Sequence, residues 1–147
     1  MFFLKYLYNY NMLKYKNIDN TAKFGFEGQI KLCKCVKVID GDSINIIMNS
    51  NSKFYVINCR LDNIDTAELK SKNSEEKMVA LQGKEYVKTR LLNKIFKIRC
   101  EKFDKFGRLL ITIFYKNDTL NNELIRQNLA YEYKGKKKRE FNDWYNN

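Results

Sequence analysis

FYVINCRLD, residues 54–62, is the clearest β-strand of the chain. Apolar and polar side chains alternate along it with a period of two residues, which is typical of a half-buried strand. Arg60 lies on the face opposite the apolar side chains, so it is free to face a groove. The shared apolar face consists of Tyr55, Ile57, Cys59 and Leu61.

Further strands and helices are expected on both sides of this stretch. Turn-forming residues such as Asp40-Gly41-Asp42 separate the β-branched runs. Five short strands with a helix between the third and fourth are typical of an OB-type barrel, an α+β fold that is mainly β, here with two to three helices. The other expected strands span residues 29–39, 43–48, 95–103 and 108–115, and the helices span residues 75–92 and 120–129, with a short third helix in the tail.

Local signals define the ends of the two longer helices. Asn73 or Ser74 can cap the first helix, and Asn128 is suited to a left-handed residue at the end of the second. Gly83 lies inside the first helix, where it costs about 1 kcal/mol relative to alanine. We therefore expect close packing at Gly83.

The length of 147 residues fits one domain, with residues 1–28 as an N-terminal extension and residues 29–147 as a single OB domain. The net charge of +11 favours a polyanionic partner, although solubility and a biased codon pool explain it equally well. The four cysteines lack metal-site spacing and are expected to be reduced core residues, which favours a reducing, intracellular location.

The first 15 residues are aromatic but are interrupted by polar side chains, so they make a poor signal peptide. A flexible aromatic arm and a segment for secretion or organelle targeting remain open alternatives. No stretch approaches the ~18 apolar residues of a spanning helix.

A set of charged residues around the predicted turns has the composition of a metal-assisted phosphodiesterase. Asp42 and Asp65 are carboxylates suited to a hard metal ion, and Arg60 and Arg108 are suited to clamping a phosphate. The chain contains no histidine, so Glu68 is the natural candidate for the general base. Taken singly, each residue has an ordinary alternative, such as a surface salt bridge between Arg60 and Asp65.

Four segments resemble the staphylococcal nuclease (thermonuclease) family, in the order and at the spacing expected for it. The match covers about residues 29–133. Ala67 stands where the family usually has proline, and Phe106 stands where it usually has tyrosine. The matching segments are VIDGDS (38–43), CRLDNIDTAE (59–68), DKFGR (104–108) and NELIRQNLAYEY (122–133).

The resemblance implies calcium-dependent hydrolysis of DNA and RNA, with little sequence specificity and with 3′-phosphorylated products. It implies Ca²⁺ ligands at Asp42, Asp65 and the Thr66 carbonyl, and a nearby acidic neighbour at Asp40. It implies catalytic roles for Glu68, Arg60 and Arg108, and contacts to the nucleotide from Lys105, Tyr131 and Tyr133.

We therefore expect a monomeric endonuclease that acts on single-stranded or frayed DNA and RNA. The chief alternative is a catalytically inactive nucleic-acid-binding OB module of the same fold. A protein-interaction domain that uses its aromatic N-terminal arm is a third. The basic run Lys136–Arg139 is interpreted as a solvated charge run, with a DNA-backbone contact or a nuclear address as alternatives.

Overall fold

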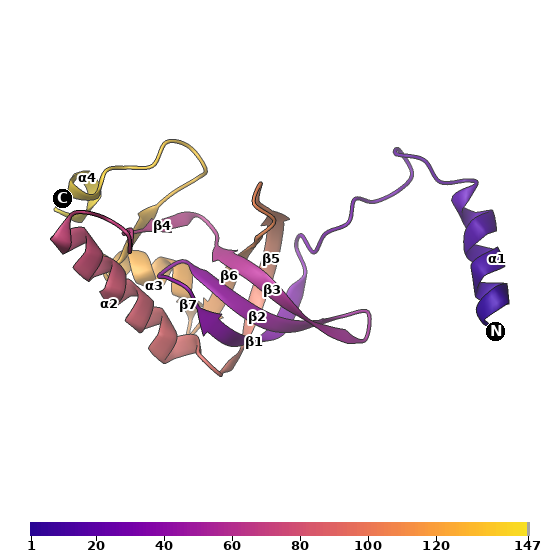
Figure 1. Cartoon of the computed structure of the whole chain (residues 1–147), viewed down its shortest axis with the longest axis horizontal. Coiled ribbons are helices and arrows are strands. Elements are labelled where there is room, and N and C mark those ends of the chain that lie inside the picture. Colours follow the sequence, from indigo (N-terminus) through magenta and orange to yellow (C-terminus); the bar gives the residue numbers. More distant parts are fainter. Residues whose placement is uncertain (147) are drawn as a thin grey trace.

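The structure is a computed structural model that describes residues 1–146. Its body is a closed OB-type β-barrel with helices at one end, while the N-terminal helix α1 lies well away from the barrel (Figure 1). The predicted α+β fold, mainly β, is confirmed. The barrel strands are β1 (Ile30–Val38), β2 (Ser43–Ser50), β3 (Lys53–Leu61), β5 (Ile95–Phe103) and β6 (Leu109–Tyr115).

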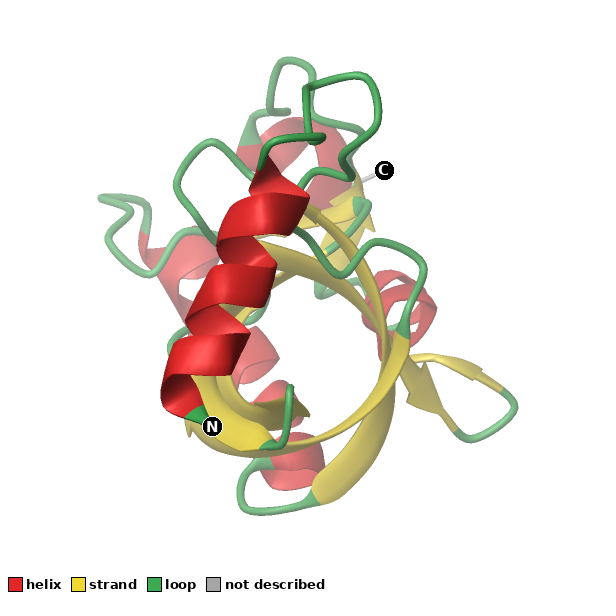
Figure 2. Cartoon of the chain, turned by 90° about the vertical axis from the view of Figure 1, so that its right-hand side faces the viewer, coloured by secondary structure: helices red, strands yellow, loops and turns green. Residues whose placement is uncertain are grey.

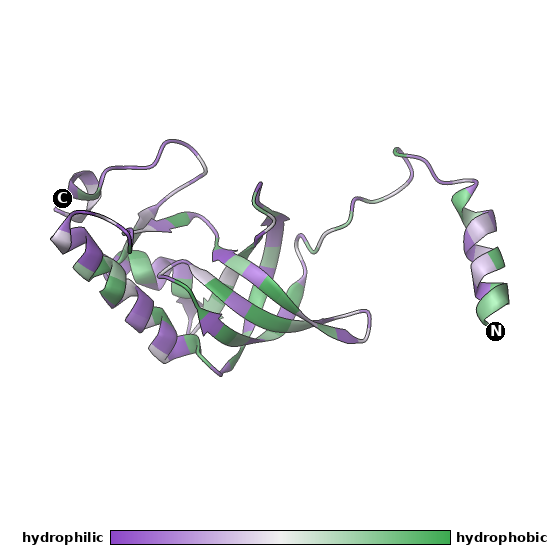
Figure 3. Ribbon diagram, in the orientation of Figure 1, coloured by the Kyte–Doolittle hydropathy of each residue, from purple (hydrophilic) through white to green (hydrophobic). Residues whose placement is uncertain are grey.

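The strands run in the order β3-β2-β1-β5-β6, and a parallel pairing of β3 with β6 closes the ring. Figure 2 shows this ring of strands. The other neighbours are antiparallel. Hydrophilic and hydrophobic residues alternate along these strands (Figure 3), because successive side chains point to opposite faces of the sheet. The inward-facing residues form the core, in which Ile44, Ile46, Ile98, Leu109, Ile111 and Ile113 are fully buried.

All five predicted strands are present, with ends that differ by up to two residues. The largest difference is at the β2–β3 hairpin, where β2 continues to Ser50 and the turn shortens to Asn51 and Ser52. Both turn residues have positive φ, 51° and 65°. Two-residue hairpin loops with this conformation follow the natural twist of the strands.

The helix expected over residues 75–92 begins at one of its two candidate caps. Helix α2 (Ser74–Leu91) is capped by the Asn73 carboxamide, which accepts from the N–H groups of Glu75 and Glu76. Helix α3 (Leu120–Arg126) ends three residues earlier than predicted, and Asn128 has the expected left-handed conformation, with φ at 55°. The short third helix of the tail is α4 (Phe141–Tyr145).

A second, small sheet pairs β4 (Ile64–Thr66) with β8 (Ala130–Glu132), and β7 (Asp118–Thr119) extends β6. Residues 63–74 lie outside the expected strands and helices and are therefore predicted to be a connecting loop, which is wrong for Asp65 and Thr66 because both lie on β4. The register of the small sheet places Asp65 opposite Tyr131. The second sheet therefore fixes three of the predicted site residues in space, Asp65, Thr66 and Tyr131.

The N-terminal region consists of α1 (Phe2–Leu13) and an extended segment that leads to β1. No residue of α1 is buried by the part of the chain that the structure describes. Phe26, by contrast, is buried beside Phe103, with ring centroids 6.1 Å apart. The core of the barrel therefore includes a side chain that precedes β1.

Candidate active site

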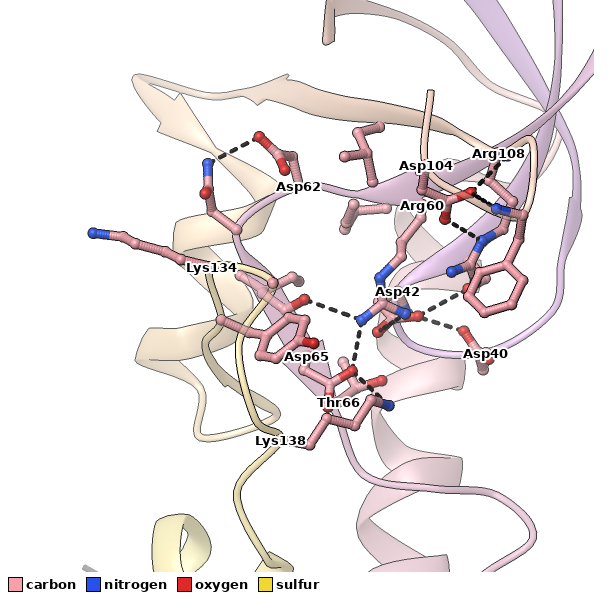
Figure 4. A pocket seen from close by; sticks show the side chains of 18 of the residues that line it. Asp40, Asp42, Arg60, Asp62, Asp65, Thr66, Asp104, Arg108, Lys134 and Lys138 are labelled. Atoms are coloured by element: carbon pink, nitrogen blue, oxygen red, sulfur yellow. Dashed lines mark hydrogen bonds and ion pairs between the residues drawn. The ribbon is translucent and has the colours of Figure 1, made fainter. Parts of the chain in front are cut away.

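Arg60 lies between two buried carboxylates (Figure 4). Its Nη1 is 3.0 Å from Asp42 Oδ2, and its Nη2 is 2.6 Å from Asp65 Oδ1. Asp42 and Asp65 are each only 3% exposed. The alternative of a surface salt bridge is therefore wrong, because the ion pairs lie inside the protein, where they are screened little by solvent.

The β2–β3 hairpin brings Asp42 to Arg60. Ser43, the first residue of β2, is paired with Arg60 on β3, and the N–H of Leu61 donates to the Asp42 carbonyl at 2.8 Å. The turn before β2 lies against β4, since a Cβ on Gly41 would be 3.2 Å from Thr66 Cγ2. The small size of Gly41 therefore allows the turn and β4 to approach.

Asp65 is held on both of its oxygens. Its Oδ2 accepts from the Tyr131 hydroxyl at 2.8 Å, and its Oδ1 contacts Arg60 and also Lys138 Nζ, at 3.2 Å. Lys138 also contacts Glu68 Oε1 at 2.9 Å. Glu68 itself is exposed at the mouth of the site, where its N–H donates to Glu76 Oε1 at 3.2 Å.

Arg108 is positioned by the turn before β6. Asp104 Oδ1 accepts from the N–H groups of Phe106 and Arg108, and Asp104 Oδ2 accepts from Arg108 Nε at 2.8 Å. These bonds hold the pKa of Asp104 below its usual range, although partial burial acts in the opposite direction. Phe106 is largely exposed, with Lys105 and Arg108 near its ring.

These residues surround one cavity of about 940 Å³. All the predicted site residues except Tyr131 line it, and Tyr131 lies buried behind Asp65. Tyr133 reaches the cavity wall, but its hydroxyl donates to the Lys136 carbonyl at 2.7 Å. The lining comprises Asp40, Asp42, Arg60, Asp65, Thr66, Glu68, Lys105, Arg108 and Tyr133, together with Asp104, Lys138 and others.

Burial shifts the ionisation of several groups in the site. Desolvation raises the pKa of Asp42 to about 7, even though the Arg60 charge acts to lower it, and Asp40 adds to the rise. Burial and the bond to Asp65 raise the pKa of Tyr131 to about 12. Burial alone would lower the pKa of Lys138, but its bonds to Glu68 and Asp65 raise it overall.

The carboxylates of the site have some, but not all, of the features of a binding site for a hard divalent cation. Among residues 1–146, the ion pairs of Asp42, Asp65 and Glu68 are made with two cations, Arg60 and Lys138, and Asp40 adds further negative charge. Two buried carboxylates that the protein neutralises incompletely suit calcium, which binds oxygen ligands in flexible geometry and completes its shell with water. Within residues 1–146, no three thiol or carboxylate side chains converge as a ready metal site.

Sequence reasoning missed two residues of the site. The basic run that contains Lys138 is expected to be solvated, but Lys138 contacts Asp65 and Glu68. Asp104 begins the segment DKFGR, and no role is predicted for it from the sequence, although an aspartate that begins a tight turn commonly binds the backbone after it. Asp104 could therefore have been found from the sequence, whereas the place of Lys138 depends on the path of the tail.

The cysteines take no part in the site. Cys33, Cys35, Cys59 and Cys100 are free thiols buried in the core, as predicted. Burial raises the pKa of Cys33 to about 12, and nearby Cys100 and Cys35 add to this effect. These thiols are therefore poor nucleophiles at neutral pH. None of the helices in residues 1–146 is both long and apolar enough to cross a membrane.

Comparison with known proteins relates the chain to nucleases. Residues 58–146, more than half of the chain, match a family model described as staphylococcal nuclease homologue. The chain is also 28% identical over 102 residues to an uncharacterized endonuclease of Haemophilus influenzae. That alignment covers 69% of this chain and 52% of the relative, so the chain spans about half of the relative's length.

Proposed function

The chain belongs to the family of staphylococcal nuclease homologues, and from this premise we propose that it is a calcium-dependent endonuclease. Its substrates would be single-stranded or frayed DNA and RNA, cut with little sequence specificity to leave 3′-phosphorylated products. The observation that carries the proposal is that Arg60, Glu68 and Arg108 line one cavity together with the buried carboxylates Asp42 and Asp65.

In the proposed reaction, Glu68 accepts the proton of the attacking water. It is suited to this role because its side chain is 63% exposed at the cavity and can reach a water molecule there. A positioned base of this kind typically contributes a factor of ~10²–10⁴ to the rate. The water oxygen bonds to phosphorus in line with the 5′-oxygen, and negative charge builds up on the phosphate oxygens. The P–O5′ bond then breaks, which leaves the 3′-phosphate, and the departing 5′-oxygen takes a proton from solvent to become a hydroxyl.

The two arginines would stabilise that charge in different ways. Arg108 contacts Asp104 through Nε, so its planar fork is held in place while two terminal nitrogens remain for phosphate. Arg60 is already engaged by Asp42, Asp65 and the Ile64 carbonyl, so it has fewer N–H groups left for phosphate than Arg108 has. Calcium held by Asp42, Asp65 and the Thr66 carbonyl would supply further positive charge to the phosphate when bound.

The cavity also offers contacts for the rest of the nucleotide. Lys105 and the exposed ring of Phe106 lie beside Arg108, and Tyr133 lies on the cavity wall. Exposed aromatic rings stack on bases of any sequence at ~1–3 kcal/mol each, which suits a substrate that is unpaired. A single-domain, monomeric protein in a reducing compartment remains our expectation.

A cleavage assay tests this function. We expect plasmid DNA and RNA to be degraded with calcium and to survive with excess chelator. End-group analysis of the products should find 3′-phosphates. If the substrates stayed intact both with calcium and with chelator, the proposal that the protein is an endonuclease would be refuted.

An inactive nucleic-acid-binding module is the second candidate. One observation favours it: the proposed base Glu68 is paired with Lys138, and Arg60 is engaged by two carboxylates. Binding that weakens steeply with salt, without cleavage in calcium, would select this function.

A further inference from the structure

Lys138 occupies an unusual place for a residue of a basic tail. Its ammonium bridges Asp65 Oδ1 at 3.2 Å and Glu68 Oε1 at 2.9 Å. In Figure 4 it approaches Asp65 from the side away from Arg60. One cation from the tail thus joins a proposed metal ligand to the proposed base.

The loop that carries Lys138 is fixed by two tyrosines. The Tyr131 hydroxyl accepts from the N–H of Arg139 at 3.1 Å while it donates to Asp65 Oδ2. The Tyr133 hydroxyl donates to the Lys136 carbonyl at 2.7 Å. Both tyrosines lie on or directly after β8, which is paired with the strand that bears Asp65. The backbone is therefore held by a tyrosine hydroxyl on each side of Lys138, and this places the lysine next to Asp65 and Glu68.

The contact can nevertheless open. The Lys138 side chain is 50% exposed, so its flexible stem can swing into solvent while the backbone of the loop stays bonded to the tyrosines. Asp65 Oδ1 already contacts Arg60 at 2.6 Å. A divalent ion that binds this oxygen would therefore meet the positive charge of Lys138 at close range.

We propose that Lys138 is a resident countercation that competes with the divalent metal ion for Asp65 and restrains Glu68 until the ion arrives. This inference rests on the proposed function, because it takes Asp42 and Asp65 to be the metal site. Lys138 leaves Asp65 when the ion binds, and Glu68 is released in the same step. The lysine thereby sets the calcium concentration at which the site is loaded.

The test is the calcium dissociation constant, measured by titration calorimetry without nucleic acid. The variant Lys138→Met keeps most of the stem and removes the charge. Lys137→Met is the matched control, because Lys137 carries the same charge in the same exposed loop and forms no ion pair with Asp42, Asp65 or Glu68 in the described structure. Lys138→Arg, which keeps the charge, should bind calcium as the wild type does.

We expect Lys138→Met to bind calcium ~3–10-fold more tightly, as suits the loss of one half-exposed competing charge. Lys137→Met should remain within about twofold of the wild type. Equal or weaker binding by Lys138→Met, in variants with unchanged circular dichroism, would overturn the inference and leave the proposed function standing. Calcium binding by none of the proteins would overturn both the inference and the proposed cofactor.

Discussion

Asp42 is a residue whose burial opposes the folded state when no metal ion is bound. Its folded pKa of about 7 lies above its ordinary value of 3.8, so the folded protein keeps a proton that the unfolded chain loses. Stability from this group is therefore present at low pH and declines as pH rises from about 4 to about 7. We expect Asp42→Asn to be more stable than the wild type at pH 8 in chelator, by about 1 kcal/mol or more.

Urea unfolding at several pH values checks this expectation, and the gain should disappear near pH 4. Asp104→Asn is the control with the opposite sign. The pKa of Asp104 is lowered in the fold, so Asp104 stabilises the protein at neutral pH, and that stabilisation is lost as pH falls through its folded pKa. If both variants were destabilised equally at pH 8, burial would not be what governs Asp42.

Glu68 carries a prediction about rate rather than stability. Its side chain is 63% exposed, so Glu68→Gln should leave the melting temperature within about 2 °C of the wild type. The same change should lower the cleavage rate by at least ~10²-fold, because glutamine cannot accept the proton of water. Glu132→Gln, a like change at an exposed salt bridge with Lys134, should cleave normally. If the Glu68→Gln variant cleaved at the normal rate, a group other than Glu68 would have to be the general base.

At the scale of single residues, the sequence is informative wherever a local pattern determines the face of a strand or helix on which a side chain lies. Alternation along residues 54–62 predicts that Arg60 lies on the face away from the core, and its side chain is 13% exposed at the cavity. The bridge from Lys138 to Asp65 joins residues far apart in sequence through a flexible side chain. No local pattern determines such a contact.

At the scale of elements, α2 packs its glycine against the turn that precedes β2. A Cβ on Gly83 would lie 3.9 Å from Gly41 Cα and from the Leu129 carbonyl, which is ordinary van der Waals contact. The helix therefore approaches the turn closely, yet it leaves room for a methyl group. Gly83 is buried in this contact, but packing so close that it requires glycine, as its place inside a helix suggests, is not found.

The two glycines should respond to alanine with opposite signs. Gly83→Ala should raise the free energy of unfolding by about 0.5–1 kcal/mol, because alanine favours the helix and fits the space. Gly41→Ala should lower it by about 1–2 kcal/mol, because its Cβ would be 3.2 Å from Cγ2 of the buried Thr66 side chain, which would have to move aside in a packed environment. Urea titrations measure both values, and effects of the same sign would contradict this account of the packing.

Short elements account for most of what the sequence does not predict. Strands β4 and β8 have three residues each, which is too few for an alternating pattern to emerge. Their existence depends on a pairing between residues 64–66 and 130–132, which are distant in sequence. The five longer strands carry their own periodicity and turn signals, so their presence was predictable.

For the whole molecule, the order of strands and helices was enough to predict a closed barrel, since few architectures accommodate five short strands interrupted by one helix. The parallel closure of β3 on β6 follows from that topology. The N-terminal region is different. Its aromatic composition predicts neither α1 nor the distance of α1 from the barrel, because nothing else in the described chain packs on this helix.

This separation leads to a prediction about truncation. A chain that begins at Phe24 would keep Phe26 in the core and the bond from the Gly28 N–H to the Cys100 carbonyl, while it loses α1 and most of the segment that follows. Its free energy of unfolding should stay within about 0.5 kcal/mol of the full chain, because the deleted residues bury no side chain in the described structure. Solubility should rise, because exposed aromatic residues are removed.

Phe26→Ala in the full chain is the comparison for this truncation, because it keeps α1 but deletes one aromatic ring at the end of the core. The ring is 7% exposed and contacts Phe103 and Phe24, so its loss should cost about 2–4 kcal/mol. Urea unfolding of both proteins, followed by circular dichroism, measures the contrast. A truncated chain as unstable as Phe26→Ala would mean that α1 packs on the barrel in solution, contrary to the arrangement in Figure 1.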